Sequence, residues 1–371
     1  MKHPDTWALV AGGGTAGHLN PGLAVARALV AAGHDPSSIH FVGAERGPEA
    51  RLVPEAGFAV DVLPGRGIQR RLSLANVGAG LDLVRAVWRG ISLVRRHRPK
   101  VVVVLGGYAS LACGVGAVLF RVPIVLVEQN QRAGAVNRLL RPFARASAVS
   151  FEGTDLPRAT VTGNPLRPEI RAMAEHPHPA AARRALGLPV DRSVVVVYSG
   201  SLGSRRINEA VAGLVRRWAD RRDLAVRHVV GHRDIVAFTA SAPEPPSDGL
   251  VYQVVEYENE VHLLLDAGDV AVSRAGGSVF ELMAAGIPSI LVPLPIATRD
   301  HQMANARAVE AAGGAVVVPD GEFDTDRLEA ELSALLDQPE RLAAMRTAML
   351  GAARLDAAEA AARVVEAAAR D

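Results

Sequence analysis

Short apolar runs alternate with longer amphipathic stretches along almost the whole chain. The runs are rich in Val and Ile, and the gaps between them are long enough for a helix. Such runs are typical of strands that are buried on both faces of a parallel sheet, with helices as the crossovers. The predicted strands are 7–11, 39–43, 101–105, 124–127 and 146–150, followed by 194–198, 226–230, 251–255, 270–273, 290–292 and 315–318.

This pattern predicts two α/β domains of similar architecture. One doubly wound sheet would not hold so many strands, and 371 residues are enough for two separate cores. Segment 162–168 (TGNPLRP) carries two prolines and a glycine, and a polar stretch follows at 176–179, as is typical of a hinge. Right-handed crossovers then give two Rossmann-like, doubly wound parallel sheets, the first over 1–165 and the second over 166–349.

Composition narrows the class of protein. The formal net charge of +2 gives no global attraction to polyanions, so any such attraction must be local. The single cysteine, Cys113, excludes an intramolecular disulfide, fits a reducing compartment and has the apolar neighbours of a core residue.

No apolar stretch approaches the ~20 residues that span a bilayer, and no signal peptide precedes the first strand. We expect a cytoplasmic protein that is soluble or peripherally bound to a membrane.

A glycine-rich turn follows the first predicted strand. Gly12, Gly14 and Gly17 match G-x-G-x-x-G, a turn that directs backbone N–H groups and a helix dipole at an anion. Alone, the motif indicates a dinucleotide site, although the acid expected after the second strand, Glu45, comes late. His18 stands at the helix start, where the dipole disfavours the protonated ring. It is either a neutral general base or a capping or packing residue.

The second predicted domain also opens with a strand, a glycine turn and a helix. Gly200, Ser201 and Gly203 in this turn offer N–H and hydroxyl donors to a diphosphate, or form a simple tight turn. Farther on, Ser278 and Glu281 have the S-x-x-E spacing of a capping box. Glu281 therefore either caps its helix or accepts hydrogen bonds from a ribose diol.

A series of motifs, taken together and in order, resembles one family of bacterial enzymes. The chain resembles the UDP-N-acetylglucosamine:undecaprenyl-pyrophosphoryl-muramoyl-pentapeptide N-acetylglucosaminyltransferases, which make lipid II from lipid I, over nearly its whole length. The resemblance implies the GT-B architecture, with the active cleft between two Rossmann-like domains and a C-terminal helix of about 350–371 that packs back on the first. The motifs are GGGTAGH at 12–18, GGYAS at 106–110, EQN at 128–130, NRLL at 137–140, GNPLR at 163–167, SGSLGSRRIN at 199–208, SRAGGSVFE at 273–281 and DHQMANA at 300–306.

The resemblance implies an inverting transfer of N-acetylglucosamine from UDP-N-acetylglucosamine to the muramoyl C4 hydroxyl of lipid I, with no cofactor and no metal. His18 is the implied catalytic base, and Glu128 and Asn130 are implied beside the reacting groups. The residues implied for the donor are Thr15, Gly17, Asn137, Arg167, Ser201, Gly203, Glu258, Glu281, His301 and Gln302. Those implied for the acceptor diphosphate are Gly13, Gly14, Gly106, Gly107 and Tyr108.

The chain departs from the family pattern at three positions. Val127 stands where the family often has His, Ala16 where the first loop often has Gly, and His301 where it often has Gln. Val127 removes a polar residue from the acceptor cleft, whereas His301 still offers a polar group to the donor. The only D-x-D, Asp324–Asp326, precedes a helical segment, where capping is a better interpretation than Mg²⁺ binding.

A basic and apolar stretch of the first domain predicts a surface that faces the membrane. Between 66 and 100 there are nine Lys or Arg residues and one acid, Asp82. Cations mixed with apolar residues either form a solvated helical face or dock on an anionic bilayer, where each cation contributes ~1 kcal/mol. The polyprenyl acceptor favours the bilayer, and no series of stacking aromatics supports nucleic acid. The predicted membrane residues are Ile68, Arg70, Arg71, Leu72, Arg85, Trp88 and Arg89.

The sequence alone is also compatible with other functions. Another GT-B UDP-sugar transferase would act on a different lipid or on a small natural product. A nicotinamide dehydrogenase would need only the first glycine motif, and an inactive basic scaffold would need neither His18 nor Glu281. The partners implied by the resemblance are the UDP-sugar, lipid I, the anionic cytoplasmic face of the plasma membrane and other cell-wall synthesis proteins, with no nucleic acid.

Overall fold

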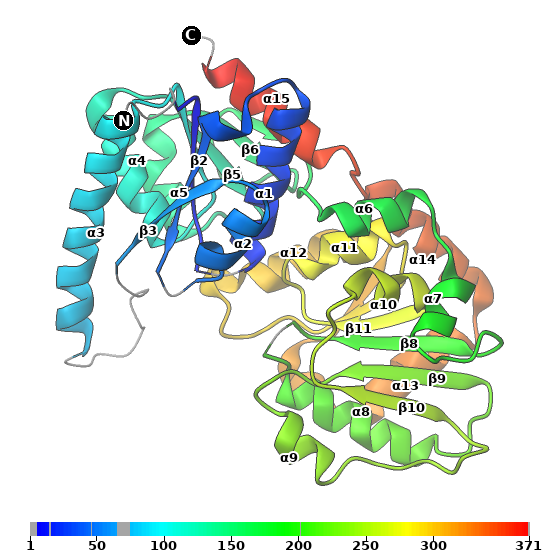
Figure 1. The fold of residues 1–371 in the computed structure, drawn as a ribbon. Coiled ribbons are helices and arrows are strands. Elements are labelled where there is room, and N and C mark those ends of the chain that lie inside the picture. The colour runs from blue at the N-terminus through cyan, green and yellow to red at the C-terminus, as the bar shows by residue number, and fades with distance from the viewer. Residues whose placement is uncertain (1–5, 15, 46, 65–74, 201, 370–371) are drawn as a thin grey trace. The chain divides into compact units, whose positions relative to one another are not determined.

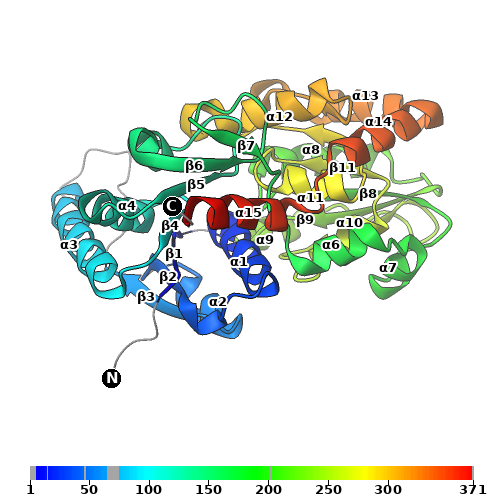
Figure 2. The same cartoon turned by 90° about the horizontal axis from the view of Figure 1, so that it is seen from above.

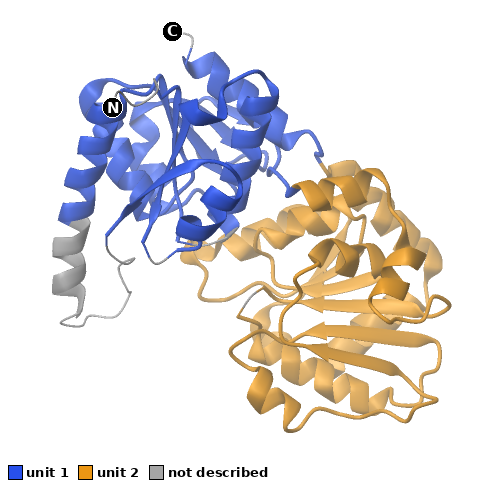
Figure 3. Ribbon diagram, viewed as in Figure 1, with its two compact units in different colours: residues 1–167, 354–371 blue, residues 168–353 orange. Residues whose placement is uncertain are grey.

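The computed structural model describes residues 6–14, 16–45, 47–64, 75–200 and 202–369. The chain divides into two compact units, one made of 1–167 with 354–371 and the other of 168–353 (Figure 3). Each unit is built round one parallel sheet with its helices packed against it (Figure 1). The predictions made for Thr15, Ile68, Arg70, Arg71, Leu72 and Ser201 lie outside the described residues.

The sheet of unit 1 has the strand order β3-β2-β1-β4-β5-β6-β7, and all its neighbouring strands are parallel. Strands β1, β4 and β5 are buried along their whole length, as expected of apolar runs that are covered on both faces. The bounds are β1 Ala8–Ala11, β2 Ile39–Ala44, β3 Ala59–Leu63, β4 Val101–Val104, β5 Ile124–Glu128, β6 Ala144–Val149 and β7 Ala159–Val161.

Both faces of this sheet carry a core, because alternate side chains of a strand point to opposite sides. Ala8 and Val10 pack with α1, α2 and α15, whereas Leu9 and Ala11 pack with α3 and α4. Figure 2 shows α1 beside α15 and α3 beside α4. Cys113 of α4 is buried in the second of these cores, which confirms that it is a core residue. The helices are α1 Ala16–Ala31, α2 Glu49–Glu55, α3 Ala75–His97, α4 Tyr108–Phe120, α5 Ala135–Leu140 and α15 Ala357–Ala369.

The C-terminal helix α15 belongs to the core of unit 1, although it comes last in the chain. Ala361 and Val365 are fully buried in the same cluster as β1 and α1. Nε2 of His34 lies 3.1 Å from Oε1 of Glu366, and both side chains are partly buried. The chain passes between the units at 167–168 and again at 353–354, the first crossing two residues after the predicted boundary.

The sheet of unit 2 has the order β10-β9-β8-β11-β12-β13, again with parallel pairs throughout. Val195 and Val197 of β8 pack with α8 and α13 on one face, and α10 packs against β8 and against α6 and α7. The strands are β8 Ser193–Tyr198, β9 Leu224–Val229, β10 Val251–Val255, β11 Val270–Ser273, β12 Ser289–Leu291 and β13 Ala315–Val317. The helices are α6 Pro168–Glu175, α7 Pro179–Ala185, α8 Arg205–Arg217, α9 Ile235–Thr239, α10 Val261–Ala267, α11 Ser278–Ala284, α12 His301–Ala311, α13 Thr325–Leu336 and α14 Pro339–Ala352.

The predicted fold class, two doubly wound parallel-sheet units, is confirmed. Each predicted strand corresponds to a strand of the structure, within about two residues at either end. The structure adds β3 and β7, which the sequence pattern did not reveal. Both lie at the edges of the sheet of unit 1 and are largely half-buried or exposed, so neither presents a continuous apolar run. Among the described helices, none is both long and apolar enough to cross a bilayer.

Candidate active site

Two glycine turns of unit 1 meet where the strand order reverses, between β1 and β4. Open α/β sheets bind ligands at such a point, outside the carboxyl ends of the strands. Gly13 and Gly14 follow β1 with φ of +141° and +88°, and Gly106 and Gly107 follow β4 with φ of +107° and +83°. A Cβ on Gly107 would lie 2.7 Å from the carbonyl oxygen of Gly13. The close approach of the two turns therefore requires glycine.

His18 lies in the first turn of α1 and reaches the second glycine turn. Its Nε2 is 3.0 Å from the point where a Cβ on Gly106 would stand. The imidazole is thus held beside the N-terminus of α4 as well as that of its own helix, and helix N-termini attract anions. The structure brings His18 together with the glycines predicted for the acceptor diphosphate.

The first turn of α4 holds the second glycine turn in place. The Ser110 hydroxyl is fully buried, accepts a hydrogen bond from the Gly106 N–H at 3.0 Å and donates to the carbonyl of Ala11, at the end of β1. The Tyr108 hydroxyl donates to the carbonyl of Leu63 at 2.9 Å. The helix is preceded by Gly107, which has no side chain to cap it. Its first N–H groups, rather than the Tyr108 hydroxyl, are therefore the donors suited to an anion.

A buried carboxyl group, Glu49, supports the first glycine turn and was not found from the sequence. Its side chain is 1% exposed, and Oε1 accepts a hydrogen bond from the Gly14 N–H at 2.7 Å. A Cβ on Gly13, Gly43 or Gly47 would lie within about 2.5 Å of Glu49 atoms, so the three glycines make room for it. Burial raises the pKa of Glu49, and hydrogen bonds from backbone N–H groups oppose the shift.

The substitution Glu49→Gln is expected to remove a pH dependence of stability. Because burial raises the pKa of Glu49 in the folded chain, the stabilisation it gives is present at acid pH and is lost as the pH rises through that pKa. Gln does not ionise, and its carbonyl can still accept from Gly14. The Tm of the variant minus that of the wild type should therefore grow from about pH 4 to pH 8 in calorimetry. Glu55→Gln, at an exposed position of the same helix, is the control, and parallel curves for Glu49→Gln would contradict the interpretation.

Glu128, at the end of β5, organises the loop that leads into α5. It is 2% exposed, and each of its oxygens accepts two hydrogen bonds. Oε1 accepts from the main-chain and side-chain N–H groups of Asn130 at 3.1 and 3.0 Å, and Oε2 accepts from Gly134 N–H and Asn137 Nδ2, both at 2.8 Å. With both oxygens engaged, this carboxylate suits the positioning of Asn130 and Asn137 better than proton transfer. The structure does bring the three predicted residues together.

The corresponding reversal of strand order in unit 2 lies between β8 and β11. Gly200 and Gly203 follow β8 with φ of +83° and +71°. A Cβ on Gly203 would lie 1.8 Å from the carbonyl oxygen of Val230, so this turn packs directly on the end of β9. Ser204 then caps α8 by accepting from the Ile207 N–H. The N-terminus of α8 is thereby fixed at the point where a diphosphate is predicted.

Arg274, just after β11, connects the loops of unit 2 and was not found from the sequence as a site residue. Its Nη2 donates to the Ser204 hydroxyl at 2.7 Å, and its Nη1 donates to the carbonyl of Val292 at 2.9 Å. The same Nη1 lies 2.6 Å from Oδ1 of Asp320, and both side chains are largely buried. A single guanidinium therefore holds the ends of three segments in one arrangement.

Glu281, His301 and Gln302 lie on the helices that follow this loop. The capping-box interpretation of Glu281 is not supported, because Gly277 is the cap residue and Ser278 instead donates to the carbonyl of Arg274. Gln302 Oε1 accepts from the Leu294 N–H at 2.9 Å, and its Nε2 is 3.7 Å from the position of a Cβ on Gly276. Nδ1 of His301 donates to the carbonyl of Thr298 at 2.8 Å. Of these three residues, Gln302 is therefore the one shown against the loop that follows β11.

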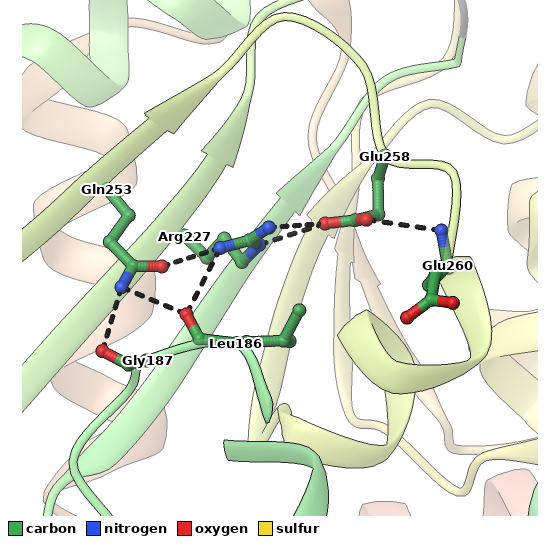
Figure 4. A network of polar contacts seen from close by, with 6 residues as sticks. All are labelled: Leu186, Gly187, Arg227, Gln253, Glu258 and Glu260. Atoms are coloured by element: carbon green, nitrogen blue, oxygen red, sulfur yellow. Dashed lines mark hydrogen bonds and ion pairs between the residues drawn. The ribbon is translucent and has the colours of Figure 1, made fainter. Parts of the chain in front are cut away.

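Glu258 is held in a buried polar network that Figure 4 shows. Its Oε2 accepts from Nε and Nη2 of Arg227 at 2.9 and 2.7 Å, and its Oε1 accepts from the Glu260 N–H at 3.2 Å. Arg227 also donates to Gln253, which in turn donates to the carbonyl of Gly187. The Glu258 side chain is thus engaged within the unit.

The other predicted residues have simpler surroundings. Gly17 is exposed in the first turn of α1, and Arg167 is half-buried as the last residue of the first segment of unit 1. Asp324 caps α13 by accepting from the Arg327 N–H at 2.8 Å, and Asp326 pairs with Arg217 at 2.6 Å. The capping interpretation of the D-x-D is therefore confirmed for Asp324.

Comparison with known proteins supplies the family. The glycosyltransferase family 28 N-terminal domain matches residues 8–149, and the C-terminal domain of the same family matches residues 194–364. The UDP-N-acetylglucosamine–N-acetylmuramyl-(pentapeptide) pyrophosphoryl-undecaprenol N-acetylglucosamine transferase of Desulforudis audaxviator is 37% identical over 352 residues, which cover 92% of each chain. The enzyme of the same name from Nocardioides sp. is 38% identical over 367 residues, 96% of each chain. The chain belongs to this transferase family. It is therefore a glycosyltransferase, and the resemblance carried by the motifs is confirmed.

Solved structures show the fold of the transferase. MurG of Acinetobacter baumannii matches 98% of this chain and 100% of its own, with a TM-score of 0.76 and 22% identity. The calicheamicin glycosyltransferase CalG4 matches 98% of each chain, with a TM-score of 0.65 and 17% identity. A UDP-GlcNAc 2-epimerase from Neisseria meningitidis, bound to UDP-GlcNAc, covers 95% of this chain and 97% of its own, with a TM-score of 0.66 and 13% identity. At such identities the likeness concerns the fold alone, and it confirms the GT-B architecture.

Proposed function

We propose that this transferase moves N-acetylglucosamine from UDP-N-acetylglucosamine to the muramoyl C4 hydroxyl of lipid I and so makes lipid II for peptidoglycan. The observation that carries the proposal is the match to transferases of that name over more than 90% of the chain, at 33–38% identity. The two glycine turns, one at the strand-order reversal of each unit, support it because the reaction needs two diphosphate sites. The relatives do not favour a different lipid or natural-product acceptor.

Unit 2 is assigned to the donor. The N-terminus of α8, fixed by Ser204, suits the diphosphate of a UDP-sugar. Glu281 lies in the first turn of α11. A carboxylate there suits the diol of a ribose. Gln302, which lies against Gly276, suits the sugar. The proposed donor set is completed by Arg167, His301, main-chain atoms near Glu258, and the unit 1 residues Thr15, Gly17 and Asn137.

Unit 1 is assigned to the acceptor. The adjoining turns at Gly13–Gly14 and Gly106–Gly107 join the N-termini of α1 and α4, which together suit a diphosphate with two charged groups. His18 touches the second turn and is proposed as the base that takes the proton of the attacking hydroxyl. Glu128 is proposed to hold Asn130 and Asn137 toward the same site.

The proposed reaction is an inverting displacement. The C4 oxygen of the acceptor forms a bond to the anomeric carbon as the bond to the UDP oxygen breaks, and the hydroxyl proton passes to His18. The negative charge that develops on UDP is proposed to be met by the dipole of α8 and by Arg167. In this proposal, groups of the protein stabilise the leaving UDP, and the step needs no cofactor.

The direct test is transfer of radiolabelled N-acetylglucosamine to lipid I by the purified full chain. A labelled lipid II product, together with stabilisation of the protein by UDP and none by NAD, is the expected result. Thermal shift at saturating ligand gives the second measurement. Transfer only to acceptors without a lipid diphosphate, or consumption of UDP-N-acetylglucosamine without acceptor, would overturn the proposal.

The exposed face of α3 is proposed to dock unit 1 on the anionic cytoplasmic face of the plasma membrane. Trp88 is 68% exposed and Val84 55% exposed, beside the exposed cations Arg85 and Arg89. The buried stripe of this helix is formed instead by residues such as Leu93 and Val94, so packing does not explain Trp88. An exposed Trp among cations suits the headgroup region of a bilayer. Binding to other cell-wall synthesis proteins stays a prediction of the family resemblance.

The double variant Trp88→Ala/Arg89→Gln is expected to bind anionic vesicles several-fold more weakly than the wild type. Each cation near the surface contributes about 1 kcal/mol, and the indole adds apolar burial. Flotation with vesicles that contain phosphatidylglycerol measures the bound fraction. Leu350→Ala/Arg346→Gln removes an equivalent exposed pair from α14 of unit 2 and is the matched control. Equal flotation of the two double variants would contradict membrane docking by α3.

A further inference from the structure

Three side chains with metal-ligating atoms meet near the edge of the sheet of unit 1. They are His40 on β2, Asp61 on β3 and His97, the last residue of α3. Oδ2 of Asp61 lies 2.9 Å from Nε2 of His40 and 3.6 Å from Nε2 of His97. All three ligand atoms lie within 4.8 Å of one another. The two imidazole rings are tilted by 35°, with centroids 4.2 Å apart.

The fold brings these residues together from distant parts of the sequence. In the parallel β2–β3 pair His40 is in register with Ala59, so Asp61, two residues on, points to the same face. That face is the one that α3 and α4 cover, and His97 arrives there at the end of α3. The cluster lies beside the start of β2, whereas the glycine turns follow the ends of β1 and β4. It is therefore separate from the candidate active site.

The spacing of the three atoms suits a small divalent metal ion. Zinc binds His nitrogen and carboxylate oxygen at about 2.0–2.2 Å, and tetrahedral geometry then puts neighbouring ligand atoms about 3.3–3.5 Å apart. The distances between the three ligand atoms of this cluster, from 2.9 Å up to at most 4.8 Å, lie on both sides of the tetrahedral distance. Side-chain adjustments of a fraction of an ångström to about one ångström would bring all three into ligand positions. Two imidazoles with one carboxylate form a donor set that is found at zinc sites.

An outer hydrogen bond orients the most buried ligand. The Thr6 hydroxyl lies 2.9 Å from Nδ1 of His97, whose side chain is only 1% exposed. When Nδ1–H donates to this hydroxyl, the lone pair of Nε2 faces His40 and Asp61. Such an outer partner is usual for histidines that bind metals. His40 is mostly buried and Asp61 is 36% exposed, so the carboxylate marks the side from which an ion and its water ligands can enter.

A second histidine–carboxylate pair of unit 1 serves as a comparison for the cluster of three residues. His34 and Glu366 also approach to 3.1 Å, as an ordinary partly buried pair. Among the described residues, only the group at His40 has three such ligand side chains converging on one point. The pair at His34 therefore offers an internal control of the same chemistry.

We propose that His40, Asp61 and His97 form a site for one divalent transition-metal ion, with zinc as the fitting example. The ion joins β2 and β3 to the end of α3 and so stabilises unit 1. It takes no part in the proposed transfer reaction, so the site and the reaction are tested separately. The family resemblance implied a reaction without a metal, and no local motif points to this cluster, because its three residues are far apart in the chain and have no ligand spacing.

The test uses the full chain without a polyhistidine tag, stripped of metal with EDTA and titrated with Zn²⁺ or Co²⁺. One equivalent of metal is expected to bind, Co²⁺ should show the visible absorption of a low-coordinate site, and saturating Zn²⁺ should raise the Tm by roughly 5–10 °C. His40→Gln and Asp61→Asn should abolish these responses. Thr6→Val should weaken binding by about 10–100-fold, the usual cost of removing an outer partner.

His34→Gln is the control and should keep the full response of the wild type. His40 and Asp61 are chosen because they are less buried than His97, and circular dichroism of the metal-free variants checks their folding. A wild-type chain that binds no metal would overturn the proposal. So would a folded His40→Gln variant that binds as much metal, with the same Tm shift, as the wild type.

Discussion

Replacing His18 with Ala is expected to lower kcat by about 10²–10⁴-fold, the usual contribution of a general base. The ring lies against Gly106, at the junction of the two helix N-termini proposed to hold the acceptor diphosphate. The muramoyl hydroxyl must lose its proton there as the sugar is transferred, and Ala has no group to accept it. Donor affinity should be retained, because the proposed UDP loop belongs to unit 2. Steady-state transfer to lipid I and thermal shift with UDP measure the two quantities.

A second readout separates catalysis from packing. If His18 acts as a base, the fall of kcat/KM at acid pH reports its protonation, and this fall should vanish in His18→Gln, which fills similar space but cannot take a proton. His34→Ala, in the segment that follows the C-terminal end of α1, removes a histidine from the same unit and should leave turnover unchanged. Near-normal turnover of His18→Ala would remove His18 from the role of base.

Much of the fold follows from local pattern. Val101–Val104 is buried along its whole length, and such strands stand out in the sequence because both of their faces require apolar residues. Edge strands such as β3 and β7 carry half-exposed patterns that resemble loops, and they were missed. The order of the strands was not predictable in detail, since it depends on crossovers that leave no local signature.

Some features of the candidate site could likewise be predicted from the sequence, and others could not. The glycine turns were predictable because each needs a backbone conformation, with positive φ, that other residues avoid. Glu49 and Arg274 were not, because each acts on a segment far along the chain: Glu49 on Gly14, Arg274 on Ser204. Glu128 was predicted near the reacting groups, and its contacts indicate a positioning role that still awaits a test. Isolated charged residues carry no spacing pattern that would reveal such partners.

Replacing Arg274 with Ala is expected to destabilise unit 2 by about 3–5 kcal/mol, the usual cost of removing one partner of a buried ion pair. Asp320, largely buried, would lose the guanidinium 2.6 Å from its Oδ1 and keep only the more exposed Arg206, whose Nε lies 3.4 Å from Oδ2. The Val292 carbonyl would lose a donor. The Tm of this unit should fall by roughly 6–20 °C. The hydroxyl of Ser204 would lose its anchor, so the N-terminus of α8 would be less well ordered and UDP should bind more weakly.

A double-mutant cycle with Asp320→Ala identifies the cause of that loss. If the loss of this partner by the buried Asp320 charge accounts for most of it, Arg274→Ala/Asp320→Ala should be more stable than Arg274→Ala alone, although it carries one more substitution. UDP affinity should not recover in the double variant, because Ser204 still lacks its donor. Calorimetry and UDP titration therefore separate two roles of one side chain, the ion pair and the anchoring of α8. A double variant that loses the sum of the two single losses would show that Arg274 and Asp320 contribute independently, despite their 2.6 Å separation.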